Sequence, residues 1–258
     1  MLILLGLFAC KVTDAPEDVE DLVVYAFDHT DDSNRFRTAS GDGLVPVIDE
    51  QFDAMLEGYA VHSLTADDIR GVGVELPEDE ELDIVGAAST VDMVSELDPV
   101  ADVLCDDNLE DVFSATIEYD VNEEIGDRDC FLSHECDGYD IVGTRVTDLG
   151  LLGEGTQDFE SAFRWVALSD GRTGLFIRQL SPDDTVLGND IVKIHSNYSF
   201  AFLYPKTDGG LRRMEAQWID AEVVGADIPE TFALDIAVRT MANRANELDV
   251  FLGAVVEE

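Results

Sequence analysis

The chain has 258 residues, of which 57 are acidic and 15 are basic, so its formal net charge is −42. A field of this sign repels nucleic-acid phosphates, which argues against nucleic-acid binding, and it also repels anionic lipid surfaces. Hydrophobic residues make up 46% of the chain, which is enough for a sizeable core. The composition predicts a folded, strongly acidic protein that binds divalent cations weakly and without a specific site.

An uncharged apolar run occupies residues 1–9 and ends in Ala9, directly before Cys10. The run is too short to cross a bilayer but long enough for the apolar region of a signal peptide. A small residue before the cysteine and an acidic stretch after it resemble the lipobox of bacterial lipoproteins. The resemblance implies that residues 1–9 are a signal peptide, that Cys10 is lipidated, and that residues 10–20 form an acidic tether. The alternative is a buried N-terminal element that contains an ordinary cysteine.

Strands and helices both feature in the first half of the remaining chain. Residues 22–27 read as a strand, and an apolar stripe predicts a helix from residue 47 or 48 to Gly58. Two short apolar runs between residues 71 and 88 flank an acidic turn and predict a hairpin. A second helical region is predicted from about residue 91 to residue 113, with a break or kink at Pro99.

Two cysteines, Cys130 and Cys136, lie in a polar stretch with the character of a loop. A disulfide between them suits an oxidising periplasm or cell surface. A zinc site that uses Cys130, His134 and Cys136 is the alternative, but it lacks a clear fourth ligand and the usual C-x-x-C spacing. Cys105 lies in an apolar run and is expected to be a buried thiol.

The second half of the chain predicts an antiparallel meander followed by a helix. Asp-Gly turns at residues 170–171 and 208–209 separate pairs of strand-like segments. The last helix opens at Pro229, carries an apolar stripe and stops at Gly253. The predicted strands cover residues 141–147, 161–168, 174–180, 191–204 and 211–224.

Aromatic side chains alternate along the fourth of these strands and therefore share one face of the sheet. Sheet order is expected to bring aromatic residues of two neighbouring strands close to them. Two interpretations stay open: the rings fill the core beneath the last helix, or they line an apolar ligand cavity between sheet and helix. The candidate ligand-binding residues are Phe163, Trp165, Tyr198, Phe200, Phe202 and Trp218.

This order of elements resembles the helix-grip arrangement of START-related domains, in which a curved antiparallel sheet wraps the last helix. The resemblance covers residues 22–252, and we expect a single α+β domain over residues 21–258. The stretches Phe163-Arg164-Trp165-Val166 and Ala216-Gln217-Trp218, together with the cysteine pair, resemble uncharacterised cell-envelope lipoproteins of the myxobacterial type.

Catalytic motifs do not stand out in the sequence. None of the four histidines pairs with another at helical spacing, and neither a G-x-S-x-G elbow nor a glycine-rich phosphate loop occurs. The acidic clusters at residues 106–108 and 183–190 do not match a calcium-binding loop. We therefore expect neither an enzyme nor a resident cofactor or metal.

The function expected from the sequence is that of a lipid-anchored cell-envelope lipoprotein with a non-catalytic binding or structural role at the membrane surface. Lys11 follows Cys10, and the lipoprotein resemblance then implies the outer membrane. The alternative is a periplasmic carrier or sensor of a hydrophobic ligand held between the sheet and the C-terminal helix. An enzyme of START-like architecture is a third reading. The expected partners are the membrane, through the anchor, and an envelope protein or a hydrophobic ligand.

Overall fold

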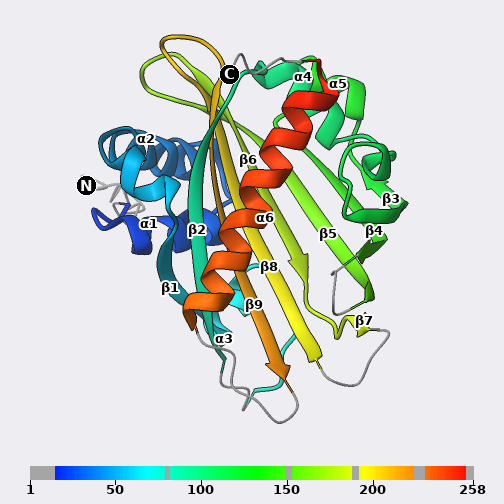
Figure 1. Cartoon of the computed structure of the whole chain (residues 1–258). Helices are drawn as coiled ribbons and strands as arrows, with labels where there is room; N and C mark the ends of the chain where they lie inside the picture. Colours follow the sequence, from blue (N-terminus) through cyan, green and yellow to red (C-terminus); the bar gives the residue numbers. More distant parts are fainter. Residues whose placement is uncertain (1–14, 79–81, 149–152, 188–191, 224–229, 254–258) are drawn as a thin grey trace, which may run out of the picture.

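One antiparallel sheet organises the protein, and helices pack on both of its faces (Figure 1). The computed structural model describes residues 15–78, 82–148, 153–187, 192–223 and 230–253. The expected signal peptide, the lipidation site Cys10 and the expected helix start at Pro229 lie outside the described residues.

The sheet of the described chain has nine strands: eight follow the order β1-β2-β9-β8-β6-β5-β4-β3, and the short β7 pairs with β5. The strands are β1 (Tyr59–Thr65), β2 (Asp83–Met93), β3 (Thr116–Ile125), β4 (Gly138–Asp148), β5 (Glu154–Ala167), β6 (Thr173–Ser181), β7 (Val186–Leu187), β8 (Val192–Pro205) and β9 (Leu211–Val223). The helices are α1 (Val19–Asp28), α2 (Asn34–Leu56), α3 (Ala66–Gly71), α4 (Leu97–Leu104), α5 (Arg128–Leu132) and α6 (Glu230–Phe251).

The sheet has two different faces, because successive side chains of a strand point to opposite sides. The inner face lies under α6 and includes Arg145, Gln157, Phe163, Trp165, Gln179, Ser199, Glu215 and Gln217. The outer face lies under α1 and α2 and includes Val166, Phe176, Tyr198, Phe200, Phe202, Met214 and Trp218. In Figure 1, α6 crosses in front of the sheet, whereas α1 and α2 lie behind it.

The larger apolar core fills the space between the outer face and the two N-terminal helices. Leu22 and Phe27 of α1 and Ile48 of α2 are fully buried in it. The ring centroids of Phe27 and Trp218 lie 5.4 Å apart. Burial of one such side chain stabilises the fold by about 1.5–3 kcal/mol, so this core holds α1 and α2 on the sheet.

A second core lies on the inner face, at the end of the sheet where α4 and α5 pack. Phe131 of α5 and Leu203 of β8 are fully buried there, next to Trp165. Ala245 and Leu248 bring the C-terminal part of α6 into the same core. The inner face is therefore apolar at this end.

Asp249 ties the C-terminal part of α6 to the segment between β2 and α4. Its carboxylate is 3% exposed and accepts hydrogen bonds from the backbone N–H groups of Val94 (2.9 Å) and Ser95 (3.0 Å). The Ser95 hydroxyl donates a third bond at 2.6 Å. Three donors on one buried carboxylate fix the position of this end of α6.

The predicted meander and last helix are confirmed. The strands β4, β5, β6, β8 and β9 match the five predicted segments, and both Asp-Gly turns lie between hydrogen-bonded neighbours. The φ angle of Gly253 is +72°, the left-handed value expected where a helix stops. The predicted α+β class, with a meander packed against a C-terminal helix, is therefore correct.

Residues 22–27 are not a strand, because they belong to α1. The carboxylate of Asp18 caps this helix and accepts a hydrogen bond from the backbone N–H of Glu20 at 3.0 Å. Leu22, Ala26 and Phe27 are buried on the side that faces the sheet. Burial of this stripe outweighs the weak helix propensity of the neighbouring valines, which had suggested a strand.

The helix α2 begins well before the predicted start at residue 47 or 48, although its predicted end near Gly58 is confirmed. Gly41 and Pro46 lie inside it and are poor helix formers, so they hid its first half from the sequence pattern. Gly41 serves packing instead. A Cβ at this position would lie 2.6 Å from Cδ2 of Leu168, so glycine lets α2 approach the sheet closely.

The predictions for residues 71–113 were only partly correct. The partner of β2 in its hairpin is β1, and residues 71–76 form no strand. Residues 91–93 belong to β2, and the predicted second helical region is reduced to α4 and a short 3-10 turn at Leu109–Asp111. Pro99 is the third residue of α4 and lies in its first turn, where a backbone N–H would have no acceptor within the helix. A proline at this position therefore causes no break or kink.

Strand β3 was not predicted. It is an edge strand, and four of its ten side chains are exposed acids. Charged residues are common on edge strands because they discourage pairing with other chains, and they also remove the apolar alternation by which a strand is found. Within the described residues, no helix combines the length and apolar character needed to span a bilayer.

Candidate ligand-binding site

The middle of the inner face is polar, although α6 crosses above it. The register places Ser161, Gln179, Ser199 and Gln217 opposite one another across β5, β6, β8 and β9. Further polar side chains from these strands and from β4 flank this row. They are Arg145, Gln157, Ser181, Asn197, Arg213 and Glu215.

Two glutamine amides hold the guanidinium of Arg145. Its Nη1 donates to Oε1 of Gln179 and its Nη2 donates to Oε1 of Gln157, both at 2.8 Å. Each amide nitrogen is used as well: Gln157 donates to the Thr185 hydroxyl at 3.0 Å and Gln179 to the Ser161 hydroxyl at 3.2 Å. These five residues, named the arginine–amide cluster, therefore orient each other.

Arg145 has no carboxylate partner among the residues that the structure describes. Partial burial, and secondly the positive charge of Arg244 on α6, lower the pKa of Arg145 to about 10. The group therefore remains protonated at neutral pH. Its charge is balanced at short range only by neutral amides, which is an unfavourable place for a cation.

Two arginines on the outer face form ion pairs with carboxylates. Arg178 is 3% exposed and forms an ion pair with Asp31. Arg164 lies 2.5 Å from the same carboxylate and also pairs with Asp140. Within the described residues, carboxylates thus form ion pairs with these two arginines, whereas none hydrogen-bonds Arg145.

Glu215 is a buried carboxylate on the inner face, and two arginines contact it. It is 3% exposed and lies 2.6 Å from Nη2 of Arg213 and 3.4 Å from Nη1 of Arg244. Arg213 is 6% exposed, and its Nε and Nη1 atoms have no hydrogen-bond partner. With Arg145, three guanidinium groups therefore lie in this region of the inner face, and two of them contact the Glu215 carboxylate.

A further buried polar atom lies on the inner face without a partner. Ser181 is fully buried, and its hydroxyl oxygen makes no hydrogen bond. The register places Ser181 opposite Asn197, whose side-chain oxygen accepts a bond from Gln217 at 3.1 Å. Buried polar atoms without partners are uncommon and cost about 1–3 kcal/mol each.

Apolar side chains border the arginine–amide cluster. The Cζ atom of Arg145 lies 5.9 Å from the centroid of the Phe159 ring, which stacks on Tyr119 at 5.0 Å. Ile141 and Phe163 of the neighbouring positions are also buried. The covered face therefore combines hydrogen-bonding groups with an apolar border, which suits an amphipathic molecule.

The six aromatic residues predicted as a ligand site do not form one group. Phe163 and Trp165 lie on the inner face, beside α5. The other four lie on the outer face, in the core beneath α1 and α2. They are Tyr198, Phe200, Phe202 and Trp218, and each is at most 1% exposed.

The sequence analysis missed the polar residues of the inner face. Their signal was present in the same alternation, because Gln179, Ser199 and Gln217 stand between the aromatic and aliphatic residues of their strands. The sequence pattern placed this row only on the face opposite the aromatic residues. It was overlooked because strand alternation separates two faces without saying which of them a helix covers.

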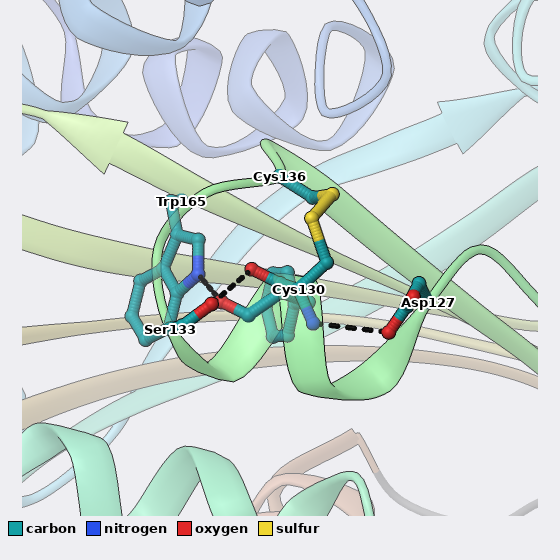
Figure 2. The surroundings of a disulfide bond; sticks show 6 residues. Asp127, Cys130, Ser133, Cys136 and Trp165 are labelled. Atoms are coloured by element: carbon teal, nitrogen blue, oxygen red, sulfur yellow. Dashed lines mark hydrogen bonds between the residues drawn. A yellow bond between two sulfur atoms is a disulfide. The ribbon is translucent and has the colours of Figure 1, made fainter.

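The predicted disulfide between Cys130 and Cys136 is confirmed, with their Cα atoms 5.3 Å apart (Figure 2). Asp127 caps α5, the short helix that contains Cys130, by accepting a hydrogen bond from the Cys130 N–H at 3.0 Å. The indole N–H of Trp165 donates to the Phe131 carbonyl at 2.7 Å. The disulfide uses both sulfurs, so no thiolate is left for the alternative zinc site with His134.

Cys105 is 3% exposed and unpaired, as predicted, and burial raises the pKa of its thiol. Within the described residues, no group of three or more histidine, cysteine or acidic side chains could hold a metal ion. In the cluster at residues 106–108, both aspartates hydrogen-bond Asn108. Part of the cluster at residues 183–190 lies outside the described residues.

A separate surface cleft of about 450 Å³ opens beside α4 and the β8–β9 turn. Asp98, His134 and Lys206 supply charged or titratable groups to its lining. The Nε2 atom of His134 lies 3.0 Å from Asp98, and its ring stacks on Trp165 at 4.0 Å. These contacts use the histidine for packing, and the cleft does not adjoin the arginine–amide cluster.

No protein-family model matches the chain, and no curated protein matches its sequence. Solved structures match at the level of the fold. A START superfamily protein from Mycobacterium smegmatis is 8% identical, with a TM-score of 0.41 over 66% of this chain and 99% of that one. The human StarD13 lipid transfer and protein localization domain is 14% identical, with a TM-score of 0.42 over 64% of this chain and 77% of that one.

A STAR-related lipid transfer protein from Xanthomonas axonopodis is 19% identical, with a TM-score of 0.41 over 66% of this chain and 86% of that one. These structural neighbours are START-related domains, which agrees with the resemblance inferred from the order of elements. At such identities the likeness concerns the fold alone.

Proposed function

We propose that this chain is a non-catalytic binding protein, a carrier or sensor that holds an amphipathic, largely hydrophobic ligand between the inner face and α6. One observation carries the proposal: the covered face of the sheet is polar at its centre and apolar at its border. The unpartnered atoms of Arg213 and Ser181 support it, because a ligand with polar groups would satisfy them.

The side chains of the site fit binding better than catalysis. Amides, hydroxyls and guanidinium groups donate and accept hydrogen bonds, but none of them is a base at neutral pH. The one carboxylate, Glu215, is engaged by Arg213 and Arg244. Recognition of a ligand needs no more than this set provides.

We also propose that the protein acts in a cell envelope and is anchored there by a lipid on Cys10. The apolar run before Cys10 supports the anchor, and the disulfide suits an oxidising compartment. Mass spectrometry of the mature protein from its host tests this. We expect an N-terminus at Cys10 with acyl chains attached, and an unmodified Met1 terminus would contradict it.

The ligand proposal is tested with the full chain and the neutral fluorophore N-phenyl-1-naphthylamine. Ser199 is partly buried at the centre of the inner face, so Ser199→Trp should fill the site. Thr156→Trp places the same side chain at an exposed position on the opposite side of β5 and serves as the control. We expect saturable binding by the wild type and the control, and at least a tenfold loss in Ser199→Trp.

Native mass spectrometry of protein purified from its host provides an independent measurement. A co-purified small molecule that is absent from Ser199→Trp would support the proposal. A protein without any bound molecule, together with unsaturable fluorophore binding, would contradict it and favour a structural role at the membrane surface.

A further inference from the structure

Arg145 differs from the other shielded arginines of the described chain in having neutral partners only. Arg37, Arg164, Arg178 and Arg213 each contact a carboxylate. In a chain with 57 acidic residues, a shielded arginine without one is unexpected from composition. The two glutamines hold its guanidinium in one orientation, and neither of them carries a negative charge.

Arg244 adds a second positive charge from the helix above. It is close enough to lower the pKa of Arg145 by repulsion, after burial, the larger cause. The Glu215 carboxylate attracts the Arg145 guanidinium and so acts to raise its pKa, but it accepts hydrogen bonds from Arg213 and Arg244 and none from Arg145. Two like charges that approach each other across the sheet–helix interface are stabilised when an anion lies near both.

We infer that the ligand held under α6 carries an anionic oxygen group, a carboxylate or a phosphate, and that Arg145 and Arg244 supply its counter-charge. This inference rests on the proposed function and specifies the chemical class of the ligand. The glutamines of the arginine–amide cluster act as positioning residues, because they orient the guanidinium of Arg145. The apolar part of the ligand would lie along Phe159 and the buried residues beside it.

The negative surface charge of the protein makes a preference for anionic ligands unexpected. A net charge of −42 repels anions at long range, so the surface favours a neutral or cationic ligand. A preference for anions therefore has to come from the partly buried arginines beneath α6. It should persist at high salt, since salt screens the surface charges more than a shielded pair.

Three ligands with the same chain length test the inference on the wild-type full chain. Dodecanoate, dodecyl phosphate and methyl dodecanoate each compete with N-phenyl-1-naphthylamine below their micelle-forming concentrations. We expect at least one of the two anions to bind about tenfold or more tightly than the neutral ester, as charge-assisted hydrogen bonds to arginine would give. The stronger of the two anions identifies the headgroup as a carboxylate or a phosphate.

Gln157→Glu is the decisive variant. It places a carboxylate where an amide now lies 2.8 Å from Arg145, and so supplies an internal counter-ion without changing the side-chain shape. We expect anion affinity to fall to the level of the ester, so that the ratio of anion affinity to ester affinity approaches one. A thermal midpoint at or above that of the wild type would show that the fold is intact.

Arg145→Gln should have the same effect by removing the charge. Arg70→Gln is the matched control, because it removes one positive charge at an exposed ion pair with Asp67, on α3. We expect Arg70→Gln to leave the anion preference unchanged. If Arg145→Gln is too unstable to measure, Gln157→Glu still decides the question.

The outcomes separate the two proposals. Equal affinities for anions and ester in the wild type, or an anion preference that survives Gln157→Glu, would overturn the inference and leave the proposed binding function standing. Absence of any saturable binding or displacement would overturn the binding function itself.

Discussion

At the residue scale, Asp28 shows how the fold changes a side chain's chemistry. It is the last residue of α1, and its Oδ1 atom is buried without a hydrogen-bond partner. Burial, and then the negative charge of Asp68, raise its pKa to about 7, although Arg178 acts in the opposite direction. An unfolded aspartate has a pKa of about 3.9.

The raised pKa makes stability depend on pH. The folded chain binds this proton more tightly than the unfolded chain, so the contribution of Asp28 is most favourable below about pH 4 and is lost as the pH rises towards 7. Asp28→Asn stays neutral throughout. We expect its thermal midpoint to equal that of the wild type near pH 4 and to exceed it by a growing margin up to pH 8.

Asp53→Asn controls for the general effect of removing one negative charge, since Asp53 is exposed on α2. The margin of Asp28→Asn over Asp53→Asn should grow between pH 4 and pH 7 in thermal unfolding followed by circular dichroism. Equal midpoints for the two variants at every pH would show that the Asp28 carboxylate is not destabilised in the folded protein.

At the scale of elements, the attachment of α6 is the feature on which the ligand site depends. The helix covers the inner face, and Asp249 connects its last turns to Val94 and Ser95. Leu248 also packs this end into the apolar core of the inner face, and Met241 packs farther along the helix against Ala87 of β2.

Asp249→Ala removes the acceptor for three hydrogen bonds and leaves two backbone N–H groups unpaired. We expect a loss of about 2–4 kcal/mol in the free energy of unfolding, measured by urea denaturation. Amide hydrogen exchange in α6 should accelerate as well. Val250→Ala, at a position that is 65% exposed, should change neither quantity. Unchanged exchange in Asp249→Ala would mean that other contacts hold the helix.

Other elements show where local sequence rules hold. Strands β6, β8 and β9 were predicted well because alternation and Asp-Gly turns depend on neighbouring residues alone. The helix α1 was missed because its valines suit a strand locally, whereas its burial against Trp218 comes from a distant part of the chain. Tertiary contacts thus reversed a weak local preference.

At the scale of the whole molecule, the main feature is the strong negative charge. The formal net charge is −42, and many of the ion pairs that do form involve exposed carboxylates, such as those of Asp67 and Asp102. Exposed pairs contribute about 0–1 kcal/mol each, so they offset little of the repulsion. Self-repulsion of the acids should therefore limit the stability of the folded state.

Added salt should raise the thermal midpoint, because screening weakens repulsion within the compact state more than in the expanded chain. Calorimetry in sodium chloride from 0.05 M to about 1 M checks this. Millimolar calcium should act in the same direction by diffuse binding to the acidic surface. If calcium and sodium chloride are equally effective at equal ionic strength, screening is the cause. A midpoint independent of salt would mean that the acids are paired or far apart.

The sequence by itself determined the features that depend on short-range patterns. The alternation of β8 and β9, the amphipathic last helix and the spacing of Cys130 and Cys136 each led to a correct prediction. The strong negative charge also follows from composition alone. None of these depends on knowing which segments meet in space.

Only the tertiary structure decided what each face of the sheet does. The row with Phe200 packs under α1 and α2, and the row with Gln179 lies under α6. Period-two alternation defines both rows but gives no information about which helix covers which row. The partners of Arg145 come from β5 and β6, and Arg244 reaches the site from a helix about a hundred residues away. The charge balance at the site was therefore set by packing between distant segments.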